Sequence, residues 1–441
     1  MTEIRPFRGV RYNQSMIDDL ASVICPPYDI ITLQAQQELY SKSEYNFVQL
    51  ECGRESAQDT ITDNKHTRSA ATLDQWLKQG ILTADDAPTI YFHDHYFTYQ
   101  EKQYRRRGVT VCVRLEEWDD MTVHLHEGTL AEPMSERLSL LRACQANTSP
   151  ILALFEDHGQ KVSTLLGAQE QKRPIIKLSS ADGQSHYVRA ITESEVINQI
   201  CRSLVHQPLY IADGHHRYKS ALTYRQERLA RSSSVSEDDA FNFVMMTLVA
   251  FSDPGLIVLP PHRLVRGISK STLDKLMPKL RSFFEVEEFP LTVPDVWQRV
   301  HDSLTSIRPM MTNQVNLALF VITAERFFVL RLSDFTTARE LMPHSHSELY
   351  YGLDVSIVDH IIMEKLLGID NSEERATIFY SYDKQDAVQR VLAQEYQLAI
   401  LLNPIRIEVI KGIADTGDRM PRKSTYFYPK VPSGLILNRL E

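Results

Sequence analysis

The 441-residue sequence has only five cysteines and sixteen glycines. The cysteines are odd in number, scattered and never arranged as Cys-x-x-Cys, which argues against a disulfide framework and a thiolate zinc site. None of the glycines belongs to Gly-x-x-x-x-Gly-Lys-Ser/Thr, Gly-x-Ser-x-Gly or Gly-x-Gly-x-x-Gly, and His-Glu-x-x-His is also absent. The usual sequence support for common NTPases, esterases, dinucleotide-binding enzymes and metalloproteases is therefore missing.

Long apolar runs are missing as well. No stretch approaches the roughly 20 apolar residues that a membrane span needs, and the first ten residues include Glu3, Arg5 and Arg8 in place of an apolar signal core. We therefore expect a cytoplasmic protein with no membrane partner. The net charge of -9 disfavours nucleic acid as the main partner, because phosphate neutralisation needs a basic surface.

The composition is that of a folded protein, with 43% hydrophobic and 24% charged residues. The length leaves room for two or three domains, and the mixture of helical and alternating patterns predicts the α+β class, with mixed sheets and helices. We predict an N-terminal anion- or nucleotide-binding α+β domain at 1–235. A larger α+β C-terminal half at 236–441 would follow, with a tail able to return to the site.

Local patterns predict individual elements within this framework. Strands are expected at 89–99 and 108–115, joined through a basic turn at 101–107, and a second hairpin at 315–323 and 327–332. Short strands are expected at 151–155 and 208–212. Helices are expected at 32–41, 136–146, 215–231 and 353–367, the last capped by Gly368. The polar stretch 232–239 reads as a mobile loop.

The densest group of ligand-binding residue types is Asp213-Gly214-His215-His216-Arg217. It directly follows a predicted buried strand and opens a predicted helix, whose free N–H groups and positive dipole end favour anions. Gly214 would let a ligand approach the backbone, and Arg217 can place two donors on phosphate or carboxylate oxygens. Phosphate is therefore the preferred ligand. In the structural alternative, Asp213 caps the helix and pairs with Arg217 while both histidines are solvated.

Along nearly its whole length the chain resembles the bacterial and archaeal family called domain of unknown function 1015. The markers are Pro6-Phe7-Arg8-Gly9, Pro26-Pro27-Tyr28-Asp29, Arg107-Gly108-Val109, Val113-Arg114-Leu115-Glu116-Glu117, His126-Glu127-Gly128-Thr129, Ala146-Asn147-Thr148-Ser149-Pro150, the element from Asp213 to Tyr218, and Lys423-Ser424-Thr425-Tyr426-Phe427-Tyr428-Pro429-Lys430. This resemblance implies a fold and candidate residues more than a reaction.

The segment Gly214-His215-His216-Arg217 also looks like the phosphate-gripping motif of the ParB and sulfiredoxin superfamily, which includes nucleotide-dependent free-serine kinases. The resemblance implies a ParB/sulfiredoxin-like core in which this motif grips nucleotide phosphates. It also implies an early acidic residue that acts on the acceptor hydroxyl, a role that Asp29 fits. The large C-terminal half departs from the small members of that superfamily, so which acidic residue matches theirs is left open.

Phosphoryl transfer needs phosphate donors, usually Mg²⁺, and a carboxylate at the attacking hydroxyl. Asp29 and Glu127 are the catalytic candidates, although a turn-capping aspartate and a loop-anchoring pair of His126 and Glu127 are the structural alternatives. Substrate-binding or supporting roles are expected for Arg8, Tyr28, His126, Asn147, Ser149, Lys423 and Tyr426, with turn or tail-anchoring roles as the alternative for the last four.

The preferred hypothesis is a kinase-like phosphotransferase that uses ATP or ADP with Mg²⁺ and phosphorylates a hydroxyl-bearing metabolite, with free serine as one candidate acceptor. A nucleotide-sensing regulatory or ParB-like binding protein is the first alternative. The second is a metal-dependent hydrolase built on His124, His126 and Glu127, since two histidines in alternation on a strand face one side. The pattern gives no indication of the oligomeric state.

Overall fold

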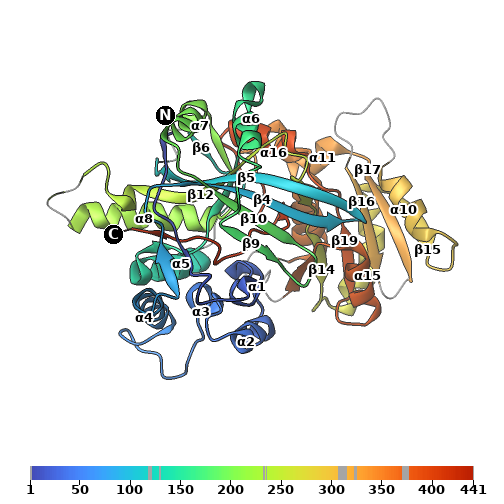
Figure 1. The fold of residues 1–441 in the computed structure, drawn as a ribbon. Helices are drawn as coiled ribbons and strands as arrows, with labels where there is room; N and C mark the ends of the chain where they lie inside the picture. Colours follow the sequence, from blue (N-terminus) through green and yellow to red (C-terminus); the bar gives the residue numbers. More distant parts are fainter. Residues whose placement is uncertain are drawn as a thin grey trace. The chain divides into compact units, whose positions relative to one another are not determined.

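The computed structural model describes residues 2–117, 122–128, 131–231, 234, 236–305, 315–321, 325–369 and 377–440. These residues form two compact units, each a mixture of strands and helices, so the predicted α+β class is confirmed (Figure 1). The first unit comprises Met1–Leu125, Thr129–Ile257 and Pro429–Glu441, and the second comprises His126–Gly128 and Val258–Tyr428. The predicted domain boundary after residue 235 stays a prediction.

A mixed sheet organises the first unit. Its strands run in the order β6-β11-β8-β12-β5-β4-β10-β9, with β1 also paired to β5. β11 is parallel to β6 and β12 is parallel to β8, whereas the other neighbours are antiparallel. The bounds are β1 Ile4–Arg5, β4 Ile90–Tyr99, β5 Lys102–Arg114, β6 Val123–His124, β8 Ile151–Phe155, β9 Ile176–Ser179, β10 Ser185–Ile191, β11 Leu209–Asp213 and β12 Phe243–Ala250.

Helices cover both faces of this sheet. Residues of α6, α7 and α8 pack with one face in a core that includes Val111 and Met246, and residues of α4 pack with the other in a core that includes Cys112 and Met245. The apolar side chains alternate between the two cores along β5 and β12, as the period of a strand requires. The bounds are α4 Lys65–Lys78, α5 Ala131–Cys144, α6 Lys161–Ala168, α7 Ser194–Leu204 and α8 His215–Arg231.

The remaining elements of the first unit are short. They are α1 Leu20–Val23, α2 Leu33–Lys42, α3 Val48–Glu51, the paired strands β2 Val10–Tyr12 and β3 Leu82–Ala84, and the paired strands β7 Ala146–Asn147 and β21 Asn438–Arg439. The predicted helix at 32–41 is confirmed as α2, which Thr32 caps by accepting a bond from the Ala35 N–H. The predicted helix at 136–146 begins earlier and ends at Cys144, because the next residues pair with the C-terminal strand.

The hairpin of β4 and β5 is confirmed, but the basic turn predicted at 101–107 is wrong. The chain turns at Gln100 and Glu101, whose φ angles of 48° and 63° suit a tight hairpin turn. The arginines belong to β5 because the facing strand pairs them: Arg107 donates to Asp94 at 3.0 Å, and Arg106 donates to His95 at 3.1 Å. The partners on β4 thus stabilise β5 from Lys102 onward, although the many charged residues of this segment suggest a loop.

The second unit contains a six-stranded sheet in the order β15-β17-β16-β19-β14-β18. Its bounds are β14 His262–Val265, β15 Phe284–Pro290, β16 Asn316–Val321, β17 Arg326–Leu332, β18 Ile378–Ser381 and β19 Leu398–Leu401. The predicted hairpin is confirmed by the pairing of β16 with β17, although residues 322–324 lie outside the described part. The other strands are β13 Ile257–Leu259 and β20 Tyr426–Tyr428.

Helices of the second unit are α9 Lys270–Leu280, α10 Val296–Thr305, α11 Phe335–Glu340, α12 Glu348–Tyr351, α13 Asp354–Ile357, α15 Lys384–Leu392 and α16 Ile407–Asp415. The helix predicted at 353–367 is confirmed, but only α13 is an α-helix. Residues Val358–Leu367 continue it with the wider π-helical spacing, and Gly368 ends it with a φ of 74°.

Two further expectations concerned a mobile loop at 232–239 and the lack of a membrane span. Of the predicted mobile loop at 232–239, Ser232, Ser233 and Val235 lie outside the described residues. A membrane-crossing helix would need both length and apolar character, and no helix among the described residues has both.

Candidate functional site

The predicted strand, turn and helix around Asp213 are present. β11 ends at Asp213, Gly214 makes the turn, and α8 begins at His215. Arg217, in the first turn of α8, folds back over the bend and donates to Asp213 Oδ2 at 2.5 Å. Its other terminal nitrogen donates to Ser149 Oγ at 3.1 Å and to the Pro150 carbonyl. The ion pair between Arg217 and Asp213 that the structural alternative expected is therefore present. The bonds from Arg217 to Ser149 and Pro150 tie α8 to the loop before β8.

Gly214 makes room for this arginine. Its φ of 102° is one that residues with a Cβ rarely adopt, and an added Cβ would lie 2.9 Å from Arg217 Nε. The sequence interpretation gave that space to a ligand. In the structure the Arg217 guanidinium occupies the space next to Gly214, so the Gly214 backbone is covered by a side chain of the protein and is not open to a ligand. Behind it, His215 is buried and His216 is half-buried.

Lys430 completes the cluster from the far end of the chain. Its ammonium pairs with Asp213 Oδ1 and lies 3.7 Å from Asp29 Oδ2. The two carboxylates therefore share one cation. Lys430 was not among the predicted site residues, although it ends the family marker that begins at Lys423 and belongs to the tail that was expected to return to the site.

Opposite charges fix the protonation states in this cluster. Burial by itself would raise the Asp213 pKa, but Lys430 and Arg217 outweigh it and hold that pKa well below its ordinary value. Burial would lower the Arg217 pKa, and the carboxylates of Asp213 and Asp29 are among the neighbours that raise it instead. Asp213 is therefore an ionised carboxylate at neutral pH, clamped between two cations.

The loop with Tyr28 and Asp29 lies beside these charges. Tyr28 begins a single 3₁₀ turn, Tyr28–Ile30, and its ring lies 4.0 Å from the guanidinium carbon of Arg137. Burial raises the Tyr28 pKa, which is also influenced by the charges of Arg137 and Arg217. Tyr28 is therefore uncharged at neutral pH although both arginines influence it. The next residue along the chain, Asp29, is exposed.

A second buried ion pair supports the arginine side of the site. Glu51 is fully buried, lies 3.5 Å from Arg137 Nη1 and accepts from Ser149 Oγ at 3.1 Å. Sequence reasoning found Ser149 but missed Glu51 and Arg137, which lie in helices without a motif. Asn147 has a different role, because its Oδ1 accepts from the Met245 N–H and the Asn438 amide and so ties the tail to the sheet.

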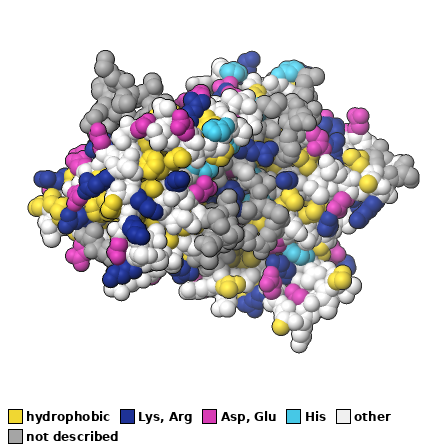
Figure 2. Space-filling view, turned by 180° about the vertical axis from the view of Figure 1, so that it is seen from behind, with side chains coloured by type: hydrophobic (Ala, Val, Ile, Leu, Met, Phe, Trp, Pro, Cys, Tyr) yellow, Lys and Arg dark blue, Asp and Glu magenta, His cyan; other side chains and the backbone are white. Residues whose placement is uncertain are grey.

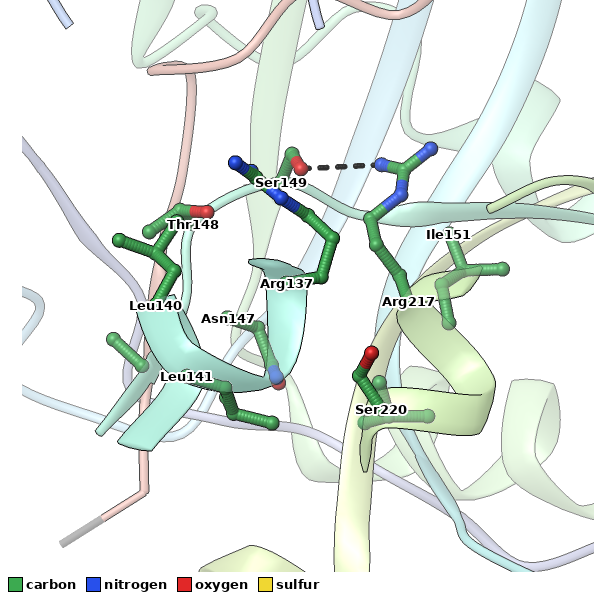
Figure 3. Close-up of a pocket in the computed structure, with 11 residues that line it drawn as sticks. Arg137, Leu140, Leu141, Asn147, Thr148, Ser149, Ile151, Arg217 and Ser220 are labelled. Atoms are coloured by element: carbon green, nitrogen blue, oxygen red, sulfur yellow. Dashed lines mark hydrogen bonds between the residues drawn. The ribbon is translucent and has the colours of Figure 1, made fainter. Parts of the chain in front are cut away.

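Between α5 and α8 lies a partly open cavity, which we call the α5–α8 pocket. Its empty volume is about 400 Å³, counting space open to solvent. Its polar lining consists of Arg137, Asn147, Thr148, Ser149, Arg217 and Ser220. Leu140, Leu141, Ile151 and Val244 line its apolar part. Figure 3 shows the two arginines reaching toward Ser149 from different helices.

The remaining predicted site residues lie in other surroundings. Arg8 donates to the Asp85 carbonyl at 2.9 Å. In the second unit, Glu127 Oε1 accepts from the N–H groups of Ser424 and Thr425 at 3.1 and 2.9 Å, and the His126 ring lies 3.0 Å from Thr425 Oγ1.

These contacts are of the kind that the loop-anchoring alternative for His126 and Glu127 expected. Tyr426 stacks on Tyr382 at 3.7 Å, and the Lys423 carbonyl accepts from Arg263 at 3.1 Å.

Histidine clusters were considered as metal ligands. His124, at the end of β6, stacks on Tyr210 at 4.8 Å. Within the described ranges, no group of three or more His, Cys, Asp or Glu side chains is arranged to hold a metal ion.

A separate buried histidine cluster lies in the sheet of the first unit. His93 and His186 share a hydrogen bond of 3.0 Å, and His95 accepts from Arg106, which also donates to the Pro429 carbonyl at 2.7 Å. Burial, followed by the charge of Arg106, lowers the His186 pKa to about 3. Burial lowers the pKa of Arg106 itself to about 10. The histidines are therefore neutral at physiological pH, whereas Arg106 stays protonated and holds the Pro429 carbonyl next to Lys430.

Comparisons with known proteins agree with the sequence resemblance. The model of a family described as a protein of unknown function, DUF1015, matches residues 4–356. A search of curated proteins gave no match.

Solved structures give distant matches that each cover 74% of this chain. A conserved hypothetical protein from Pyrococcus furiosus is 13% identical over 93% of its own chain, with a TM-score of 0.35. A free serine kinase variant in complex with ADP is 12% identical over 92%, with a TM-score of 0.36. SbnI from Staphylococcus aureus is 11% identical over 85%, with a TM-score of 0.35.

Proposed function

The chain belongs to the DUF1015 family, and we propose that it is a nucleotide-dependent, kinase-like phosphotransferase acting on a hydroxyl-bearing small molecule. The carrying observation is the shared cation between two carboxylates: Lys430 pairs with Asp213 and lies 3.7 Å from Asp29. Arg217 is bonded to the same Asp213. Phosphoryl transfer is catalysed mainly by positioning and by charges of this kind around the transferring group.

The cations of this cluster suit the nucleotide phosphates. Arg217 holds a guanidinium charge beside Asp213 and Lys430, which favours the negative charge of a phosphate group. Lys430 adds a second positive charge, and the N-terminus of α8, with His215 and His216, adds a favourable dipole. In this proposal Arg217 and Lys430 bind the phosphates.

Mg²⁺ and the acceptor have different partners in this proposal. Lys430 and Arg217 occupy the two carboxylate oxygens of Asp213, so the nucleotide phosphates would hold Mg²⁺ beside this cluster. Such an ion would neutralise charge on the transferring phosphate. Asp29 is exposed and accessible to an acceptor hydroxyl, so we assign it the role of base. Glu127 is less suited, because three donors from Ser424 and Thr425 already occupy its Oε1.

The test combines binding with turnover. Titration calorimetry with ATP, ADP, CTP and GTP, each with Mg²⁺, should identify a nucleotide, and release of the diphosphate should depend on an added hydroxyl compound. Asp29→Asn should lower turnover by about a hundredfold or more while nucleotide affinity stays within a few-fold. Asp86→Asn, which removes an exposed carboxylate two residues after β3, is the matched control and should leave both unchanged.

The same experiment separates the alternatives. Nucleotide binding without turnover for any acceptor would favour a nucleotide-sensing regulatory protein. On the face shown in Figure 2, Lys and Arg side chains lie among Asp and Glu side chains rather than in one basic patch, which gives nucleic acid little support as a partner. No binding of any nucleotide would refute the phosphotransferase.

A further inference from the structure

Two arginines that line the α5–α8 pocket each have a buried hydrogen-bond donor without a partner among the described residues. Arg137, whose side chain is 5% exposed, lines the pocket, and its Nε has no hydrogen-bond partner among the described residues. The same holds for the Nε of Arg217, whose side chain is 12% exposed. An unpaired buried donor costs free energy, so two of them at one cavity indicate a ligand rich in acceptor atoms.

The two arginines at the pocket already pair with three carboxylates. Arg137 pairs with Glu51 and Glu136, and Arg217 pairs with Asp213. A ligand of the pocket must therefore be recognised by directed hydrogen bonds from the two arginines and not by a net positive charge. Guanidinium donors bind a planar carboxylate better than a neutral acceptor, because charge-assisted bonds are roughly twice as strong as neutral ones.

The pocket also limits what can be attached to that carboxylate. Leu140, Leu141 and Val244 give it an apolar side, and Thr148 and Ser149 add hydroxyl groups at the arginine end. The empty volume of about 400 Å³ includes space open to solvent, so the enclosed part of the pocket has room only for a small ligand. A short aliphatic body with one anionic end fits this lining.

Arg217 joins the pocket to the proposed catalytic cluster. It lines the pocket and is bonded to Asp213, and Tyr28, the neighbour of Asp29, packs on Arg137 at 4.0 Å. Resting on the proposed function, we infer that the α5–α8 pocket binds the phosphoryl acceptor and that this acceptor is a small hydroxycarboxylate. Its carboxylate lies between Arg137 and Arg217, and its hydroxyl is directed to the side of Asp29.

The test uses the full chain and pairs of small probes. Glycolate, L-lactate, D-glycerate and L-serine are compared with the matched neutral compounds ethylene glycol, propane-1,2-diol and glycerol, by calorimetry and by thermal shift. We expect at least one carboxylate to bind ten times more tightly than its neutral match. Equal affinities would overturn the inference, as would tighter binding of inorganic phosphate, which would make the pocket a phosphate site.

Two substitutions at one position locate the binding. Val244→Leu adds a methylene to the pocket and should weaken the carboxylate at least fivefold, whereas Val244→Ala enlarges the pocket and should retain binding. Neither changes a residue of the proposed nucleotide cluster. A carboxylate that binds both variants equally occupies another place, and a pocket that binds no probe holds solvent only; either result overturns the inference.

Nucleotide affinity measured in the same samples separates the two proposals. If ATP with Mg²⁺ binds and a neutral alcohol is phosphorylated, the phosphotransferase stands and the hydroxycarboxylate inference fails. If a carboxylate binds in the pocket but no nucleotide binds to the chain, the phosphotransferase fails and, with it, the acceptor role.

Discussion

Removing the Arg217 side chain is expected to weaken both the fold and the nucleotide site. In Arg217→Ala, the Asp213 carboxylate, the Ser149 hydroxyl and the Pro150 carbonyl each lose a hydrogen-bond donor. Breaking a buried ion pair typically costs about 3 to 5 kcal/mol. Lys430 stays beside Asp213, so we expect the free energy of unfolding to fall by a smaller amount, about 2 to 4 kcal/mol.

The effect on ligand binding is separate. Loss of a charge-assisted bond to a phosphate should weaken nucleotide binding by about 1.5 to 3 kcal/mol, which is tenfold or more. The ligand-binding interpretation of the sequence predicts that the fold stays intact, whereas the structural alternative already paired Arg217 with Asp213. The structure instead makes Arg217 a tie between α8 and the loop before β8.

Urea unfolding and calorimetry with ATP and Mg²⁺ measure the two effects on the same protein. Arg202→Ala, on an exposed position of α7, is the control and should change stability by less than about 0.5 kcal/mol. Arg217→Lys should recover part of the stability, since the charge remains, but not the bond to Ser149. An Arg217→Ala protein with unchanged stability and unchanged affinity would refute the reasoning on both counts.

Three further predictions concern pH and backbone strain. The Asp213 pKa is held below its ordinary value of about 3.9, so its stabilisation is present above that pH and is lost as the pH falls below it. The stability gap between the wild type and Asp213→Asn, from urea unfolding at pH 7, 5 and 3, should therefore be smallest at pH 3, and a constant gap would contradict this. His186 has a pKa of about 3 in the fold and about 6.5 when unfolded, so acidification favours the unfolded state from pH 6.5 downward. Between pH 7 and 5 the wild type should lose about 2 kcal/mol more than His186→Gln, and equal losses would show that His186 is charged in the fold. Gly214→Ala should lower the melting temperature more than Gly183→Ala, because both have positive φ but only at Gly214 does the new Cβ meet Arg217 Nε at 2.9 Å. Equal shifts would mean that Arg217 moves aside freely.

Local signals account for what the sequence predicted well. The strand, turn and helix around Gly214 are set by a buried apolar run, a glycine and an apolar helical stripe, all within about twenty residues. The helix 215–231 consequently matches α8 at both ends. The hairpin strands of β4 and β5 were predicted for the same reason. Their turn was misplaced because charge suggested a loop where Asp94 and His95 in fact provide partners for the arginines.

The partners of the site could not be found in this way. Lys430 lies 217 positions from Asp213, and Ser149 lies 98 positions from Glu51. Residues this far apart are not neighbours within one helix or one hairpin, so no periodic sequence pattern predicts that they are in contact. Glu51 is especially hard to find, because a single glutamate in a short helix is expected to be exposed to solvent. Its burial beside Arg137 is evident only from the folded structure.

The position of Lys430 depends on a tail that is fixed on both sides of it. Before Lys430, the Pro429 carbonyl accepts from the buried Arg106. After it, Ser433 bridges to Cys25 and Leu437 bridges to Val10. A flexible lysine held at its backbone by several bonds loses less entropy when its ammonium is placed between two carboxylates. The histidine cluster that supports Arg106 therefore helps to position Lys430 through the backbone of the tail, and Lys430 contacts Asp213 as directly as Arg217 does.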